Sequence, residues 1–237
     1  MTDLKIKNFY TFAKFPNPMI VEIFAREKGI DLFAIEKTVD APGLENRNAE
    51  HLARNPAGQL PYLELEDGTV IAETITICEW LEEVKPEPAF IGSTPEKRAV
   101  ARMWQRRMEE HFVYPTFYSV RFWTASEDCS GPLKNFFAQR NKVLIPGAWK
   151  EMQAWGLSRL EWLEDLKKGS PSDYIAGDEL TVVDIQVYTT LVFFEDLGAP
   201  FMKDHGERLP WTKAFIARMA ERPAVKKCHE HIKELFG

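Results

Sequence analysis

The chain has 237 residues, of which 45% are hydrophobic and 12% aromatic, enough for one large domain or two small ones with a packed core. Its 36 acidic and 30 basic residues give a net charge of −6, which argues against a nucleic-acid partner, because such proteins gather Lys and Arg in a stripe. The most basic segment, residues 97–107, spaces its charges at helical intervals between apolar residues and is interpreted as a solvated helix face.

The N-terminal sequence and the cysteines favour a cytoplasmic protein. The first ten residues hold no apolar segment of signal-peptide length, and no stretch approaches the roughly 20 apolar residues of a membrane span. Cys78, Cys129 and Cys228 are far apart and form no C-x-x-C pair, so neither a disulfide framework nor a dithiol redox site is expected. We therefore expect a reducing setting and no membrane association.

The first 84 residues predict a β-α-β unit, a connection, and then a β-β-α unit. Apolar periodicity and turn signals such as Gly29 and Asp67-Gly68 mark the boundaries. The expected elements are strand 4–12, helix 17–30, strand 31–39, strand 60–67, strand 69–72 and helix 74–84. A strand-helix-strand opening predicts a parallel pair joined by a crossover helix.

From residue 96 onward the periodicity is helical. The Pro-rich stretch 85–95 is interpreted as a linker, which gives an N-terminal domain 1–84 and an all-helical domain 96–237. The segments with helical periodicity are 96–112, 135–169, 182–198 and 209–236. No alternating strand, internal repeat or low-complexity segment is apparent in this half of the chain.

A proline, Pro61, stands where the third strand begins. Proline cannot donate to a sheet ladder, so it belongs at the first residue or the edge of a strand. One interpretation is a plain strand opener. The other is a cis peptide bond that forms a sharp turn and leaves the backbone of Leu60 free to pair with an extended ligand, as an added strand would.

A carboxylate and a hydroxyl, Glu73 and Thr74, stand where the helix 74–84 begins. Thr74 occupies the expected N-cap, and a helix start offers unpaired N–H groups and a partial positive charge that suit a ligand carboxylate. Glu73 could bind a ligand ammonium, so the pair could hold the zwitterionic end of an amino acid. The alternative is an ordinary cap followed by a favourable acidic residue.

Three motifs in chain order resemble the glutathione S-transferase superfamily. They are NPAGQLPYL at 55–63, DGTVIAETITICEWL at 67–81 and GDELTVVDIQVY at 177–188, and the last contains a capping box, Thr181 with Asp184. The resemblance spans nearly the whole chain. It implies a thioredoxin-like N-terminal domain, an all-helical C-terminal domain, glutathione as co-substrate and a homodimer.

The resemblance also implies roles for individual residues. In the family, the proline equivalent to Pro61 is cis, and the residue before it, here Leu60, pairs its backbone with the cysteinyl part of glutathione. The acidic-hydroxyl pair, here Glu73 and Thr74, binds the γ-glutamyl end. Gln59 falls where many members place a Lys or another polar contact to the glycyl end, and its neutral amide departs from the cationic version.

Catalysis requires the thiolate of glutathione, because the thiolate is the nucleophile. Many members place a Ser or Cys just before the first helix, but here the position holds Phe15, which donates no hydrogen bond. Asn17 lies two residues on, and the Nu-class and the yeast prion-protein-like branch carry a similar P-N element with the Asn amide near the sulfur. The alternative is that Asn17 is an N-cap before Pro18 at the first helical position.

Tyr10, at the end of the first strand, is held as a second catalytic candidate, with Thr11 in reserve, because tyrosine-type members use a tyrosine nearby. Aromatic residues crowd the segment 111–123, and most of them are attributed to core packing. Phe15, Tyr114, Phe117 and Tyr118 are the candidates to line an apolar pocket for the second substrate.

The sequence therefore predicts a glutathione transferase that conjugates the glutathione thiolate to an apolar electrophile. Two alternatives stay open: a glutathione-dependent disulfide reductase, which the Asn-bearing branches favour, and a non-enzymatic binding or scaffold protein on the same fold. His229 and His231 are spaced as metal ligands could be, but no further ligand accompanies them in the sequence, so no metal is expected.

Overall fold

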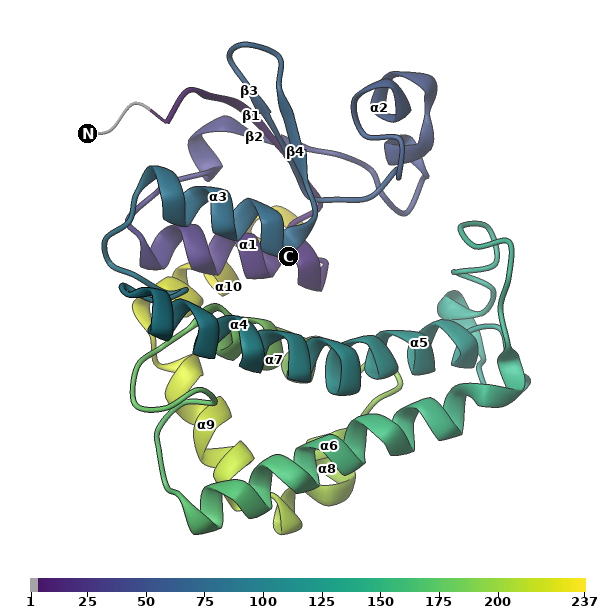
Figure 1. Cartoon of the computed structure of the whole chain (residues 1–237). Coiled ribbons are helices and arrows are strands. Elements are labelled where there is room, and N and C mark those ends of the chain that lie inside the picture. Colours follow the sequence, from purple (N-terminus) through teal and green to yellow (C-terminus); the bar gives the residue numbers. More distant parts are fainter. Residues whose placement is uncertain (1–3) are drawn as a thin grey trace. The chain divides into compact units, whose positions relative to one another are not determined.

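The computed structural model describes residues 4–237, which divide into two compact units, and each is described by itself (Figure 1). One unit comprises Met1–Ala99 together with Ala220–Gly237, and the other comprises Val100–Met219. The last helix of the chain therefore packs within the first unit.

The first unit is built on a four-stranded mixed sheet with the strand order β2-β1-β3-β4. The expected parallel pair is confirmed, because β1 runs parallel to β2 and antiparallel to β3, which is antiparallel to β4. Its strands and α-helices are β1 (Ile6–Thr11), α1 (Pro16–Glu27), β2 (Glu36–Thr38), α2 (Ala49–Arg54), β3 (Tyr62–Leu65), β4 (Val70–Ala72), α3 (Thr74–Val84) and α10 (Pro223–Phe236).

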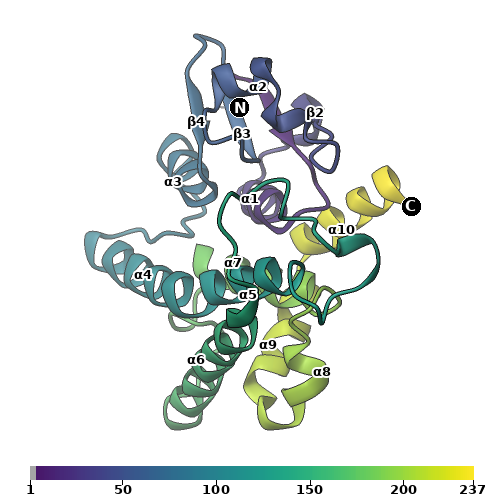
Figure 2. The same ribbon diagram turned by 90° about the vertical axis from the view of Figure 1, so that its right-hand side faces the viewer.

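The helices α1 and α3 lie side by side along the sheet, and α10 packs on α1 (Figures 1 and 2). Phe9 and Leu63, paired across β1 and β3, are completely buried, as are Ile20 and Phe24 of α1. Nine of the twelve residues of α1 are buried, so this helix is enclosed on nearly every side rather than along one apolar stripe. The thioredoxin-like expectation for this unit is confirmed.

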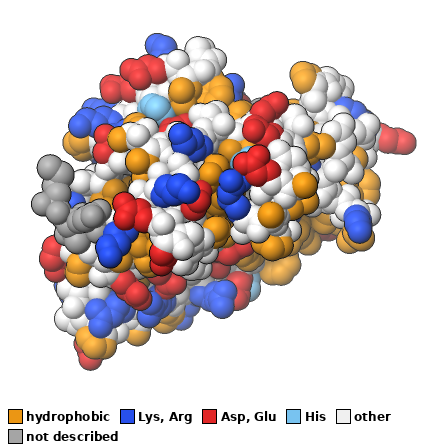
Figure 3. All heavy atoms as spheres, turned by 90° about the horizontal axis from the view of Figure 1, so that it is seen from above, with side chains coloured by type: hydrophobic (Ala, Val, Ile, Leu, Met, Phe, Trp, Pro, Cys, Tyr) orange, Lys and Arg blue, Asp and Glu red, His pale blue; other side chains and the backbone are white. Residues whose placement is uncertain are grey.

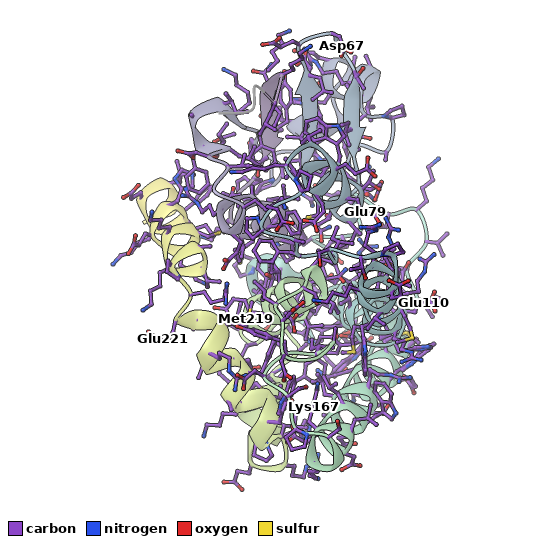
Figure 4. All side chains as sticks on the ribbon, turned by 60° about the vertical axis from the view of Figure 1, so that its left-hand side comes forward. Asp67, Glu79, Glu110, Lys167, Met219 and Glu221 are labelled. Carbon is purple, nitrogen blue, oxygen red and sulfur yellow. The ribbon has the colours of Figure 1, made fainter. Side chains whose placement is uncertain are left out.

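The second strand of the first unit is shorter than the sequence predicts. The strand expected over 31–39 is only Glu36–Thr38, because a 3₁₀ turn, Phe33–Ile35, occupies the middle of that segment. The hairpin at Asp67-Gly68 is confirmed, with Gly68 at φ +85° and the Leu65 N–H bonded to the Thr69 carbonyl at 2.8 Å. Asp67 lies at the tip of that hairpin (Figure 4).

The segment after α3 is fixed by a buried ion pair. The Lys28 ammonium, with no exposed side-chain surface, donates to Glu82 Oε2 at 2.7 Å and to the Pro88 carbonyl at 2.7 Å. Glu82 also accepts the N–H groups of Phe90 and Ile91. The Pro-rich stretch is therefore a structured connection, which agrees with the burial of Phe90 and Ile91.

The remaining elements are helical, as expected. The α-helices are α4 (Pro95–Met108), α5 (Tyr114–Trp123), α6 (Trp149–Gly169), α7 (Val182–Phe194), α8 (Phe201–His205) and α9 (Pro210–Ala220). α7 is buried almost all round and forms the centre of the second unit. α6 approaches α5 closely at Gly156, where a Cβ would stand 3.1 Å from Thr116 Oγ1.

Polar side chains fix the helix starts of this unit. The capping box is confirmed: the backbone N–H of Thr181 donates to Asp184 Oδ2 at 2.7 Å. The buried carboxylate of Glu164 accepts the N–H groups of Trp211 and Thr212 at the start of α9. These bonds satisfy N–H groups that a helix cannot pair internally.

The helix expected over 135–169 begins only at Trp149. Pro146 and Gly147 lie in a short 3₁₀ turn, and the residues before them form turns whose apolar side chains, such as Val143, stay exposed. Apolar residues at helical spacing misled the sequence interpretation here, because Val143 and Ile145 remain largely exposed instead of packing into the core. The segment 96–112 also differs, since its last turn is a π-helix, Glu109–Val113, which leads directly into α5.

Acidic and basic side chains are interspersed over the face seen in Figure 3. In the basic segment, Lys97, Arg102, Arg106 and Arg107 are exposed, as expected for a solvated helix face. Among the described residues, no helix combines the length and apolar character that a membrane span needs.

Candidate functional site

Three chain segments meet at one end of the strands in the first unit. This end, formed by the last residues of β1 and β4 and the first residue of β3, is called the sheet edge below. Tyr10, near the end of β1, pairs with Tyr62 at the start of β3, and Tyr62 pairs with Ala72 at the end of β4. The chain leaves β1 toward α1, enters β3 from Leu60-Pro61, and leaves β4 through Glu73 into α3. The starts of two helices and the proline turn therefore lie at the same sheet edge.

The start of α3 contains an unusual backbone conformation. Glu73, not Thr74, is the N-cap, so the sequence expectation for the capping position was wrong by one residue. Glu73 has φ 69° and ψ 121°, a region that L-residues rarely occupy, and its exposed carboxylate makes no capping hydrogen bond. Such strain costs about 1–3 kcal/mol and concentrates at functional sites. Thr74, half-exposed, is the first helical residue, where N–H groups point outward.

The turn before β3 has the expected geometry. The Leu60–Pro61 peptide bond is cis, the geometry that the second interpretation of Pro61 predicts. Pro61 is buried, Leu60 is half-exposed and Gln59 is exposed. Within the described part of the chain, the N–H and C=O groups of Leu60 have no hydrogen-bond partner. The backbone of Leu60 is thus available to an extended ligand at this edge.

The start of α1 differs from the alternative considered for Asn17. Phe15 is the N-cap and Pro16 the first helical residue, so Asn17 is not the N-cap. Asn17 lies in the first turn, half-buried. The Phe15 ring makes an edge contact with Phe12, with 4.8 Å between ring centroids. Phe15 presents no donor here, and the Asn17 amide is the polar side chain nearest in sequence to the helix start.

The second catalytic candidate, Tyr10, is engaged elsewhere. Its hydroxyl donates to Glu64 Oε2 at 3.0 Å, and its ring stacks on Tyr62 at 4.6 Å between centroids. Burial, followed by the Glu64 hydrogen bond, raises the pKa of Tyr10. Glu64 is correspondingly acidic: hydrogen bonds from Lys7 and then Asn8 lower its pKa to about 2. The reserve residue Thr11 is completely buried. This geometry favours Asn17 over Tyr10 as a donor to a ligand sulfur.

The aromatic residues of α5 and of the π-helical turn before it divide into two groups within the second unit. Tyr114 and Tyr118 are 47% and 42% exposed, with 6.4 Å between their ring centroids. Phe117 instead packs edge-on against Phe194 at 4.7 Å, and Phe112 is completely buried. The two tyrosines therefore give α5 an exposed aromatic surface, whereas Phe117 belongs largely to the core. Phe15, the fourth residue expected at the apolar pocket, belongs to the first unit.

Two asparagines hold the turn before β3 and were missed by the sequence interpretation. Asn46 donates from Nδ2 to the Gly58 carbonyl at 2.6 Å, and Asn55 donates to the Gln59 carbonyl at 2.9 Å. Both side chains are buried. Asn55 lies inside the NPAGQLP motif, so a signal was present for it, but nothing in the sequence marked Asn46 as its neighbour.

The histidines near the C-terminus have structural partners. His231 bonds through Nε2 to Glu36 Oε2 at 2.8 Å and stacks on Phe33. Across residues 4–237, no cluster of three His, Cys, Asp or Glu side chains is arranged to hold a metal ion. The three cysteines are buried and free.

Comparison with known proteins places these features in a family. The model of the glutathione S-transferase N-terminal domain matches residues 16–84, and that of the glutathione S-transferase C-terminal domain matches residues 157–230. Glutathione S-transferase 2 of Saccharomyces cerevisiae is 30% identical over 193 residues, covering 78% of this chain and 73% of the relative. The chain belongs to the glutathione S-transferase family.

Solved structures agree with this assignment. The crystal structure of Gtt2 from Saccharomyces cerevisiae matches with a TM-score of 0.78 and 26% identity, covering 93% of this chain and 99% of that one. Protein LigF of Sphingobium sp. is 33% identical, covering 94% of this chain and 93% of the relative. The crystal structure of LigF, described as a beta-etherase, shares the fold with a TM-score of 0.77, over 96% of this chain and 99% of that one. Relatives with different activities thus share this fold.

Proposed function

We propose that this protein is a glutathione transferase. It binds glutathione at the sheet edge, where β1 and β4 end and β3 begins, and its bound thiolate attacks an apolar electrophile. The observation that carries the proposal is the strained N-cap of α3, where Glu73 holds φ 69° without any capping hydrogen bond. A conformation that costs free energy and serves no cap needs another use. Binding the γ-glutamyl ammonium supplies one, and membership of the glutathione S-transferase family supports glutathione as the ligand.

Each part of the edge has a role in this proposal. The N–H groups at the start of α3, with the Thr74 hydroxyl, take the γ-glutamyl carboxylate, and Glu73 takes the ammonium. The free backbone groups of Leu60, before Pro61, pair with the cysteinyl residue as an added strand would. The exposed amide of Gln59 serves the glycyl end. This division orients the thiol toward the start of α1.

Asn17 is proposed as the donor to the sulfur. A hydrogen bond to the thiolate and the positive end of the α1 dipole both favour the charged form and lower the thiol pKa. Phe15 supplies an apolar neighbour but no donor. A neutral amide stabilises a thiolate less than a cation would, so we expect modest conjugating activity with generic electrophiles. Within the second unit, the exposed rings of Tyr114 and Tyr118 are the apolar surface that we propose for electrophile binding.

A second candidate function is glutathione-dependent disulfide reduction. The start of α1 favours it, because Phe15 stands where many members have Ser or Cys and Asn17 follows two residues later. In this the sequence resembles the Asn-bearing branches of the family. Cleavage of an ether, as the name of the LigF structure suggests for that relative, would use the same thiolate. We further propose a cytoplasmic homodimer, in keeping with the family.

Calorimetric titration with glutathione tests the binding site. We expect Glu73→Gln and Thr74→Ala to lose about tenfold to a hundredfold in affinity, because a hydrogen bond to a charged group contributes about 1.5–3 kcal/mol. Glu83→Gln and Thr76→Ala, exposed positions on the same helix, are matched controls that should bind as the wild type does. Equal affinity in all five proteins would overturn the assignment of the α3 start.

A further inference from the structure

The segment that carries Leu60 is held by two buried asparagines from different elements. Asn46 lies in a 3₁₀ turn, Glu45–Arg47, and Asn55 ends α2. Their amide groups donate to consecutive carbonyls, those of Gly58 and Gln59, at 2.6 and 2.9 Å. Both carbonyls are therefore turned toward the interior of the unit.

The turn between Asn55 and Leu60 has little freedom to relax. The Gly58 N–H bonds to the Asn55 carbonyl at 2.9 Å, and the Ala57 N–H reaches Asn55 Oδ1 at 3.3 Å. Gly58 has φ +58°, and a Cβ there would stand 3.1 Å from the Leu52 side chain. The left-handed conformation and the crowding both require glycine at this position. Asn55 thus contacts this turn through its side-chain amide, its side-chain oxygen and its backbone carbonyl.

The orientation of the Gln59 carbonyl determines the orientation of the next N–H group. In a trans peptide the C=O of one residue and the N–H of the next point in opposite directions across a planar unit. The Gln59–Leu60 bond is trans, since the cis bonds in the described chain precede Pro61 and Pro88. With the Gln59 carbonyl directed at Asn55, the Leu60 N–H points away from it, where no group of the described chain accepts it.

We propose that Asn55 is a positioning residue that directs the Leu60 N–H toward bound glutathione. Asn46 supports it by fixing the Gly58 carbonyl, one residue earlier. The inference rests on the proposed function, because glutathione is the ligand. Its chemistry is specific: the Asn55 amide donates a hydrogen bond to the Gln59 carbonyl and never touches the ligand. Removing the donor while keeping the side-chain shape should loosen the Leu60 N–H and weaken the ligand's cysteinyl contact.

Two Asn55 variants separate the loss of the hydrogen-bond donor from changes in side-chain shape and charge. Asn55→Asp keeps the acceptor that the Ala57 N–H uses and replaces the donor to Gln59 with a charged oxygen, whereas Asn55→Ala removes both donor and acceptor without adding charge. Asn48→Asp is the matched control, because the Asn48 side chain accepts the His51 N–H through Oδ1 at the start of α2 and donates to no group in residues 4–237. Thermal unfolding establishes that each variant is folded, and calorimetry gives its affinity for glutathione.

We expect both Asn55 variants to lose about tenfold in glutathione affinity, roughly what one hydrogen bond contributes. Asn48→Asp should stay within about twofold of the wild type. Hydrogen exchange read by NMR supplies a readout that a purely structural role would not move. Glutathione should slow exchange of the Leu60 amide in the wild type. In the Asn55 variants we expect both this protection and the affinity for glutathione to decrease.

The outcomes distinguish this inference from the proposed function. Folded Asn55 variants that bind glutathione as tightly as the wild type overturn the positioning role and leave the transferase proposal standing. A wild type that does not bind glutathione overturns both. If the Asn55 variants do not fold, the wild type alone decides: a Leu60 amide that exchanges equally fast with and without saturating glutathione contradicts the inference.

Discussion

Glu22, in the middle of α1, is expected to make the stability of the protein depend on pH. The side chain is 1% exposed, its Oε2 accepts the Cys228 thiol of α10 at 3.5 Å, and its Oε1 has no partner among the described residues. Burial is the largest cause that raises its pKa from 4.5 to about 8, followed by the nearby charge of Glu36. Arg26, one turn along α1, opposes this only partly.

The sign follows from which state holds the proton. Because the pKa in the folded chain lies above that in the unfolded chain, the folded chain keeps a proton that the unfolded chain loses between pH 4.5 and about 8. The free energy of unfolding is therefore highest below pH 4.5 as far as this group is concerned, and it falls as pH rises through that window. Each pH unit above 4.5 in this window lowers the free energy of unfolding by about 1.4 kcal/mol, so the protein is about 3 kcal/mol less stable at neutral pH than it would be below the window.

Replacing the carboxyl with an uncharged amide should remove this dependence. We expect Glu22→Gln to be more stable than the wild type by about 2–3 kcal/mol at neutral pH, and by much less near pH 4. Urea unfolding at a series of pH values measures both, with Glu230→Gln, an exposed position on α10, as the control. A wild type whose unfolding midpoint is flat from about pH 5 to 8, or a Glu22→Gln variant less stable than the wild type, would refute the reasoning.

Three further expectations concern other sites. Lys28→Met should destabilise the protein by about 3 kcal/mol in urea unfolding, because it leaves the Glu82 carboxylate without its cationic partner. Adding Glu82→Gln should recover part of the loss, and a double variant whose two effects simply add would contradict this. Glu73→Gly should raise the free energy of unfolding by about 1 kcal/mol while weakening glutathione binding in calorimetry, and a Glu73→Gly variant less stable than the wild type would show that the φ is not strained. Tyr118→Ala should raise the KM for an apolar electrophile in steady-state kinetics without changing the glutathione Kd, and an unchanged KM would remove Tyr118 from substrate binding.

The sequence predicted the elements whose signals are local. The helix Thr74–Val84 was expected with its observed bounds, because a hairpin turn precedes it and a Pro-rich stretch follows. The same pattern misplaced the cap by one residue, since nothing in the residue type shows that Glu73 holds a positive φ. That conformation depends on how β4 leads into α3, which is a property of the assembled sheet.

Features that depend on distant parts of the chain could not be predicted. α1 is covered on a second side by α10, which begins about 200 residues later, so the burial of Glu22 left no mark in its own segment. The turns before Trp149 show the opposite case: Val143 is 77% exposed, although its spacing resembles a buried helix face. Periodicity predicts which side chains could be buried, and packing decides which of them are.

The pKa of the glutathione thiol bound to the protein tests the central claim most directly. The thiolate absorbance of bound glutathione, titrated against pH, should give a pKa about one unit or more below the value near 8.5 of a free thiol. Asn17→Ala should raise it toward that value, whereas Tyr10→Phe should leave it unchanged, because the Tyr10 hydroxyl donates to Glu64. A thiol that titrates like free glutathione on the wild type would contradict the account and favour a non-enzymatic protein. A pKa that moves with Tyr10→Phe and not with Asn17→Ala would instead make this a tyrosine-type enzyme.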